Sequence, residues 1–168
     1  MEKQRLRSRL SSYWKMELGN VLILPAAMVF LCSLHEQSLS WWLALACLPM
    51  CGLLVVGGLY WRAKLHQLEG RGQSLAALLP WIAALQYPFA VLSVLSFALI
   101  LGVWLFGIGA STGEKVSITI AAALTILEYI NYYHRQLQHF DHVADFKRLI
   151  SGRGFRKSWM ARDLERIK

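Results

Sequence analysis

An acidic residue inside a long apolar stretch is the feature of this sequence with the clearest chemical potential. Glu128 lies five residues before Tyr133, where the last apolar stretch ends. A helix would place its carboxylate roughly 7 Å inside the apolar region. A charged group at membrane depth is costly and is a candidate functional group by default. Its chemistry would be cation binding or proton exchange.

Further polar residues are predicted at a similar depth on other apolar stretches. Gln86 lies on the third stretch, Asn131 lies one helical turn beyond Glu128, and two more residues open the first stretch. In one interpretation this polar layer is an ion or proton site. In the other it holds helices together, because interhelical polar contacts fix their register. The predicted layer consists of Glu17, Asn20, Gln86, Glu128 and Asn131.

The partner of Glu128 differs between these two interpretations. In the structural one, amide side chains bond a protonated Glu128, or the side chain of Arg62 or Arg135 reaches back to pair with it. In the functional one, the carboxylate exchanges a proton or binds a cation on a substrate path.

A second group of candidate residues follows the last apolar stretch. His139 and His142 are three residues apart and can share a helical face, with Asp145 three residues further on. Two imidazoles and a carboxylate on one stripe could ligate zinc or iron. A solvated polar face has the same composition, and we expect no bound metal or other cofactor.

The basic residues near the end of the chain point to a membrane surface. A cluster lies around two glycines, and anionic headgroups attract such charges. Nucleic acid is not expected as a partner, because it calls for more aromatic interleaving and a larger folded platform. The predicted headgroup contacts are Arg153, Arg156 and Lys157.

Four apolar stretches must position these groups. The chain is 56% apolar and 17% charged, and about 20 apolar residues suffice to cross a bilayer. The fold class predicted is an all-α membrane protein with two helical hairpins. A basic segment, 1–16, precedes the bundle, 17–133, and a helical tail follows, 134–168. The predicted spans are about 18–34, 41–61, 81–108 and 116–133.

The basic residues also predict the orientation of the chain. Of the 18 Lys and Arg residues, only Lys115 falls in a loop that would face outward. By the positive-inside rule, both termini are expected in the cytoplasm. The three cysteines are expected to act as small buried apolar residues rather than as reactive thiols.

Helical spacing of apolar residues continues beyond Tyr133 into the tail. Leu137 and Phe140 share this stripe, which predicts that the fourth span extends unbroken to about Ile150. An exposed apolar stripe needs a partner, so these two residues are predicted to support self-association or contact with another membrane protein. After a stop at the glycines, Ser158 is predicted to cap a final short helix, 159–167.

Three short stretches carry a resemblance to other proteins. They are Glu128-Tyr129-Ile130-Asn131-Tyr132 with Gln136-Leu137, and Met160-Ala161-Arg162-Asp163-Leu164. Together they resemble the C-terminal half of small, uncharacterised bacterial four-span proteins. The resemblance implies a bacterial inner-membrane protein and carries over no catalytic residue.

The expected function is that of a non-enzymatic inner-membrane protein. It would self-associate or support a larger complex through its cytoplasmic helix. The alternatives are a small oligomeric ion channel or proton-coupled transporter that uses Glu128, and a membrane enzyme with a metal at the histidine group.

Overall fold

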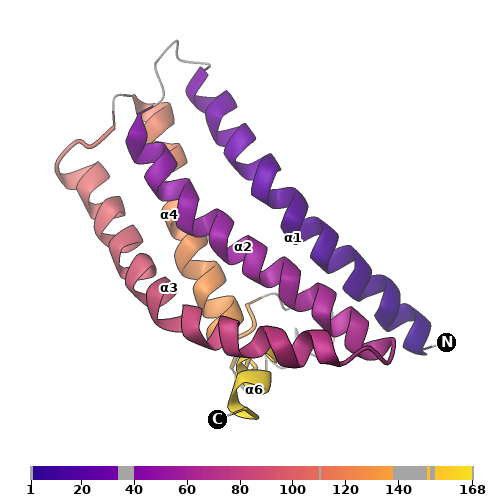
Figure 1. The fold of residues 1–168 in the computed structure, drawn as a ribbon. Helices are drawn as coiled ribbons and strands as arrows, with labels where there is room; N and C mark the ends of the chain where they lie inside the picture. Colours follow the sequence, from indigo (N-terminus) through magenta and orange to yellow (C-terminus); the bar gives the residue numbers. More distant parts are fainter. Residues whose placement is uncertain (1, 34–39, 110, 138–150, 152–153, 168) are drawn as a thin grey trace.

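The computed structural model describes residues 2–33, 40–109, 111–137, 151 and 154–167. Four long helices lie side by side in it: α1 (Glu2–Ser33), α2 (Trp41–Leu68), α3 (Gln73–Leu105) and α4 (Thr112–Tyr133). Each is long and apolar enough to cross a membrane. A short helix, α6 (Trp159–Glu165), lies below them near the end of the chain (Figure 1). This is the make-up of a multi-pass membrane protein.

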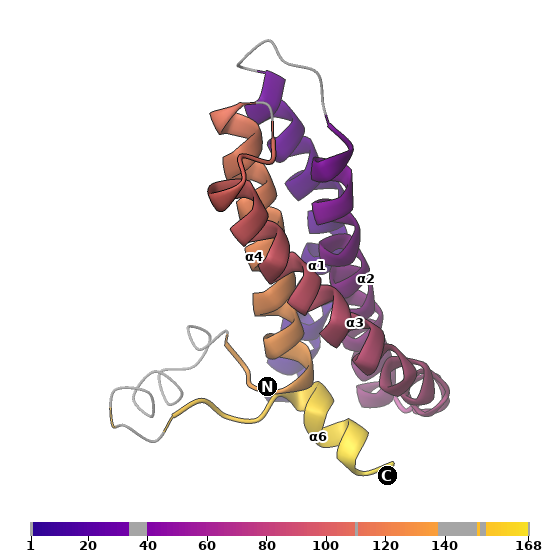
Figure 2. The same cartoon turned by 90° about the vertical axis from the view of Figure 1, so that its left-hand side faces the viewer.

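Both termini lie at one end of the bundle (Figure 1). The same end holds the α2–α3 turn and the end of α4, and most of the basic residues that the structure describes are there. We call it the basic end, and the other one the opposite end. In Figure 2, α6 runs along the basic end, beside the base of α4.

The helices extend beyond the predicted spans. α1 begins at Glu2, so the basic segment is the first part of a helix that continues into the apolar region. α3 begins at Gln73 instead of near Trp81, and its first part crosses the basic end before it turns upward (Figure 1). Pro80 and Pro88 lie inside α3. Each proline lacks the N–H for a helical hydrogen bond, which allows a helix to bend.

Local signals explain why α2 stops where it does. Gly70 has a φ of +84°, a conformation that costs glycine little. The Arg71 N–H donates to the His66 carbonyl at 2.8 Å, and the Gly70 N–H donates to Gln67 at 3.1 Å. These bonds form a Schellman cap. Arg7 of α1 pairs with Glu69 of this turn at 2.7 Å. The pKa of Glu69 is below its ordinary value, chiefly because Arg71 donates a hydrogen bond to it.

One carboxylate joins the two loops at the opposite end. The Ser111 hydroxyl accepts from the Glu114 N–H at 3.1 Å and so caps α4. The Glu114 carboxylate accepts in turn from the Ser40 N–H at 3.2 Å, at the start of α2. Glu114 is buried, so this bond links α2 to α4 where unpaired backbone groups would be costly.

The interior divides into two apolar clusters. One fills the opposite half of the bundle and centres on Met50, Ile118 and Ala121. The other lies toward the basic end and includes Tyr60, Ile82 and Tyr133, together with Met160 and Leu164 from α6. Helix α6 is therefore part of the folded core at that end.

The prediction that the fourth span continues unbroken beyond Tyr133 is wrong. α4 ends at Tyr133, and residues 134–137 are not helical. The Gln136 N–H donates to the Arg156 carbonyl at 2.9 Å, and the Ser158 N–H donates to the His134 carbonyl at 3.1 Å. Backbone bonds to a distant segment replace the helical ones. Leu137 accordingly lies off any helix, and Phe140 lies outside the described residues.

The predicted cap of the last helix is confirmed. The Ser158 hydroxyl accepts from the Ala161 N–H at 3.0 Å, and α6 ends at Glu165, two residues before the predicted end. The same hydroxyl donates to the Tyr132 carbonyl at the end of α4. One serine thus starts α6 and attaches it to the bundle.

Candidate functional site

Two acidic side chains from different helices meet in the interior near the basic end. Glu17 of α1 is only 3% exposed. Its carboxyl and that of Glu128, on α4, both interact with the hydroxyl of Tyr132, and with each other through their charges. The hydroxyl faces both carboxyls without the ideal hydrogen-bond geometry to either. We call these three residues the acid cluster.

Glycine in α2 makes the room for this arrangement. A Cβ atom on Gly57 would collide with the Tyr132 hydroxyl and ring, so α4 can bring the tyrosine here only because the position is glycine. On Gly58 a Cβ would lie 2.8 Å from Leu18, next to Glu17 in α1. The two glycines let α1 and α4 approach α2 closely, as small residues do between membrane helices.

Asn131 connects the acid cluster to the end of α4. Its side-chain amide donates to the Glu128 carboxylate at 3.2 Å. Its oxygen accepts from the Leu137 N–H at 2.9 Å, beyond the helix. Asn131 therefore orients Glu128 and also holds the segment that leaves α4.

The two arginines proposed to reach back to Glu128 are engaged elsewhere. Arg62 lies over the ring of Trp14, 5.7 Å from its centre, and Arg135 donates to the Phe155 carbonyl at 3.1 Å. Within the part of the chain that the structure describes, neither carboxyl of the acid cluster is paired with Arg or Lys. Two adjacent carboxyls in a site of low polarity cannot both ionise at modest cost. A proton or an added cation at the acid cluster would remove the cost of two adjacent carboxylates.

A small cavity of about 20 Å³ adjoins the acid cluster toward the basic end. That volume is enough for one water molecule. Its polar lining residues are Tyr60, Asn131, Gln136 and Ser158. The residues that line it are Tyr60, Trp61, Asn131, Tyr132, Gln136, Ser158, Trp159 and Met160.

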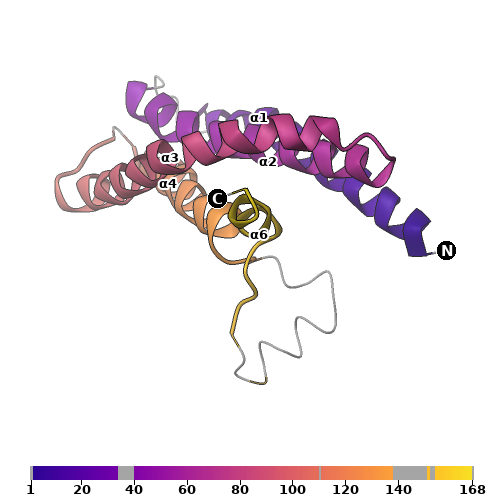
Figure 3. The same ribbon diagram turned by 60° about the horizontal axis from the view of Figure 1, so that its bottom comes forward.

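The C-terminal helix covers this cavity and is fastened by a buried acid. Asp163 is 6% exposed. It accepts from the Tyr60 hydroxyl at 2.7 Å and pairs with the Lys64 ammonium group at 2.7 Å. Both partners lie on α2, so Asp163 attaches α6 to the basic end. Figure 3 shows α6 beside the end of α4. We call Asp163, Tyr60 and Lys64 the latch.

The predicted polar layer is thus only partly assembled. Glu17, Glu128 and Asn131 come together. Gln86 instead lines a separate cleft with Tyr133 at the basic end. Asn20 is half-buried on α1.

The other predicted site residues fall in or beside the tail. The possible metal ligands His139, His142 and Asp145, and Arg153, lie outside the described residues. The described part of the chain holds no group of three or more His, Cys, Asp or Glu placed to bind a metal. Arg156 is exposed, and Lys157 pairs with Glu165 across α6. The three cysteines carry free thiols, with Cys32 and Cys47 buried.

Several residues of the site were not predicted from the sequence. Tyr132 lies one helical turn from Glu128, so the spacing could have placed it beside that carboxyl. Asp163 shares a helical face with Met160 and Leu164, which makes it an acid on an apolar stripe. The role of Lys64 had no local signal, because its partner is 99 residues away.

Comparison with known proteins finds no match, neither to a protein-family model, nor to a curated protein, nor to a solved structure.

Proposed function

We propose that this chain is a proton-coupled integral membrane protein that takes up and releases a proton at the acid cluster. The observation that carries the proposal is the meeting of Glu17 and Glu128 at the Tyr132 hydroxyl, with no cationic partner among the described residues. Intramembrane acids of this kind mark proton and ion pathways. The setting we propose is the bacterial inner membrane, with the basic end in the cytoplasm.

The surroundings of the acid cluster support exchange from the basic end. The cavity lies on that side and is bounded by hydroxyls and amides, whereas the opposite half of the bundle is filled by apolar side chains. A proton would move between the cytoplasm and the acid cluster through one water and the Tyr132 hydroxyl. A complete path across the membrane would need a second subunit, as in a small oligomeric channel or transporter.

Replacing Glu128 with glutamine tests the proposal. In wild-type protein in liposomes, infrared difference spectra should show the carbonyl band of a protonated carboxylic acid that grows as the pH falls. Glu128→Gln should remove most of this change, since the pair can no longer share a titrating proton. Proton flux followed with an entrapped pH dye should fall to the level of empty liposomes.

The same substitution at Glu114 is the matched control. Glu114 is also a buried glutamate, but it lies at the opposite end. Glu114→Gln should leave the pH-dependent band in place. An unchanged band in Glu128→Gln, or an equal loss in Glu114→Gln, would contradict the proposal. Intact masses of both variants should equal that of the wild-type assembly, which separates loss of the site from loss of the fold.

A second candidate function is that of a non-enzymatic component of a membrane complex. The observation that favours it is the bridge between Arg135 and Lys157. It holds these two residues, which are 22 positions apart, together at the basic end, and the residues between them are the proposed binding segment. This candidate keeps the predicted partner-binding role of Leu137, which follows the end of α4, and of Phe140, which lies outside the described residues.

The mass of the intact assembly tests this second function. Native mass spectrometry of wild-type protein released from nanodiscs should give an oligomer or a complex with a partner. Replacing residues 138–154 with a short Gly-Ser turn should leave a single subunit, because the proposed binding segment is removed. The bridge between Arg135 and Lys157 and helix α6 should stay folded, so the loss of the assembly would not reflect loss of the fold. Retention of the full assembly by that variant would count against a binding role for the segment.

A further inference from the structure

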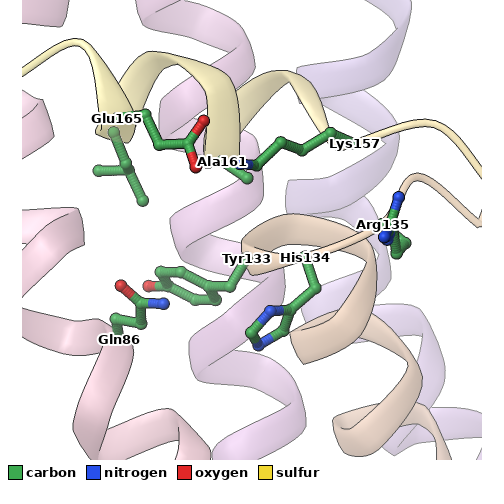
Figure 4. Close-up of a pocket in the computed structure, with 8 residues that line it drawn as sticks. Gln86, Tyr133, His134, Arg135, Lys157, Ala161 and Glu165 are labelled. Atoms are coloured by element: carbon green, nitrogen blue, oxygen red, sulfur yellow. Dashed lines mark hydrogen bonds and ion pairs between the residues drawn. The ribbon is translucent and has the colours of Figure 1, made fainter.

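A second cleft, separate from the acid cluster, opens at the basic end between α3, α4 and α6. Its volume is about 330 Å³. Figure 4 shows Gln86 and Tyr133 on one side of it, with Lys157 and Glu165 facing them from the α6 side. Its walls are Gln86, Tyr133, His134, Arg135, Lys157, Ala161, Leu164 and Glu165.

The cleft combines an apolar floor with a polar rim. Tyr133 and Leu164 are buried and belong to the apolar core of the basic end. Arg135 and Lys157 are exposed, and the ring of His134 packs edge-on against Tyr129 with 5.1 Å between centres. A ligand that fits such walls has an anionic head and an apolar body.

Aromatic side chains place the cleft at the level of lipid headgroups. Trp81 and Tyr87 flank Gln86 in α3 and are 73% and 78% exposed. Trp159, at the start of α6, is about half exposed. Tryptophan and tyrosine concentrate where membrane meets water. A phospholipid of the adjacent leaflet would therefore have its phosphate near the rim of the cleft.

The charged groups at the rim can receive a phosphate. Arg135 uses one terminal nitrogen for the Phe155 carbonyl, and its other N–H groups can donate to phosphate oxygens. Lys157 pairs with Glu165, so an incoming phosphate competes with that carboxylate. Hydrogen bonds from Arg and Lys to phosphate are charge-assisted and stronger than neutral ones.

We propose that this cleft binds the phosphate group of an anionic phospholipid between Arg135 and Lys157, with Gln86 and His134 as further donors. The site does not depend on the function proposed for the acid cluster. The proposal assigns lipid binding to one defined position instead of to the basic tail in general. Glu165 would compete with the lipid phosphate for Lys157.

Lipid retention in native mass spectrometry tests this site. Wild-type protein released from mixed nanodiscs should retain phosphatidylglycerol in preference to phosphatidylcholine. Arg135→Gln and Lys157→Gln should each lower that retention about tenfold or more, because each removes a charge-assisted hydrogen bond to the phosphate as well as a charge. Glu165→Gln should raise it, because Lys157 is released from its pair.

Arg166→Gln is the matched control, since it removes one positive charge from the same tail outside the cleft. It should lower retention much less than either cleft variant, because it removes only the general attraction of one charge to the membrane surface. Equal retention of both lipids by the wild type, an equal loss in Arg166→Gln, or a loss in Glu165→Gln would overturn the site. Displacement of the lipid by glycerol phosphate at equal concentration would overturn the lipid as occupant in favour of a soluble phosphate ester. Because Glu165→Gln keeps both cations, its predicted gain stays measurable even if a loss variant fails to fold.

Discussion

Asp163→Ala is expected to release α6 from the basic end of the bundle. The substitution leaves the Tyr60 hydroxyl without its acceptor and the Lys64 ammonium group without its counter-charge, and both groups are largely buried. Removing one partner of a buried ion pair costs about 3 kcal/mol or more. Hydrogen–deuterium exchange should show lost protection in residues 134–137 and 156–165, with the spanning helices unchanged.

Two substitutions, one in α6 and one at the residue that follows it, test which contacts the latch needs. Asp163→Asn keeps an acceptor for Tyr60 but removes the charge that pairs with Lys64, so its loss of protection should be intermediate. Arg166→Ala should change little, because Arg166 is exposed and its contact to Asp163 is long, at 3.8 Å. If α6 in Asp163→Ala stays as protected as in the wild type, the latch is not what holds it.

Gly57→Ala is expected to destabilise the bundle and to disrupt the acid cluster. The added methyl group would overlap the Tyr132 hydroxyl and ring. That ring is buried between three helices and can move only if α2 and α4 separate. Overpacking of this kind costs about 2 kcal/mol. The free energy of unfolding, measured by SDS titration in mixed micelles, should fall accordingly, and the pH-dependent carboxylic band should weaken.

Gly19→Ala is the control for glycine replacement in a spanning helix. A methyl group there would meet only Ile23, at 3.9 Å, so stability should stay the same or rise slightly through helix propensity. The double variant Gly57→Ala, Tyr132→Phe should lose less stability than the two single variants together, because the hydroxyl nearest the new methyl group is gone. Full additivity would place the strain elsewhere.

The two substitutions test different parts of the protein. Asp163→Ala tests α6, which covers the acid cluster, and Gly57→Ala tests the acid cluster itself. Asp163 acts on α6 and the cavity beneath it, whereas Gly57 acts on the position of Tyr132. If proton uptake depends on controlled access from the basic end, Asp163→Ala should change the rate of exchange while Glu17 and Glu128 stay in place. Gly57→Ala should lower the amount of proton taken up.

The site shows where prediction from sequence ends. The depth of Glu128 follows from its distance to the end of the apolar stretch, and Asn131 follows from helical spacing. That Glu17 lies beside Glu128 while Gln86 does not depends on the rotation of each helix about its own axis. This rotation is set across α1, α2 and α4 by Gly57, Gly58 and Tyr132, and no local pattern records it.

The sequence by itself determined the properties that depend on a single segment of the chain. The existence and order of four helices long enough to span a membrane depend on local apolar length, and the start of α6 depends on the Ser158 cap. The tertiary structure alone decided the end of α4, because the His134 carbonyl and the Gln136 N–H bond to Ser158 and Arg156 instead of continuing the helix. It also decided the pairing of Asp163 with Tyr60 and Lys64. Those contacts join residues about 20 to 100 positions apart, and their energy exists only once the bundle has brought the segments together.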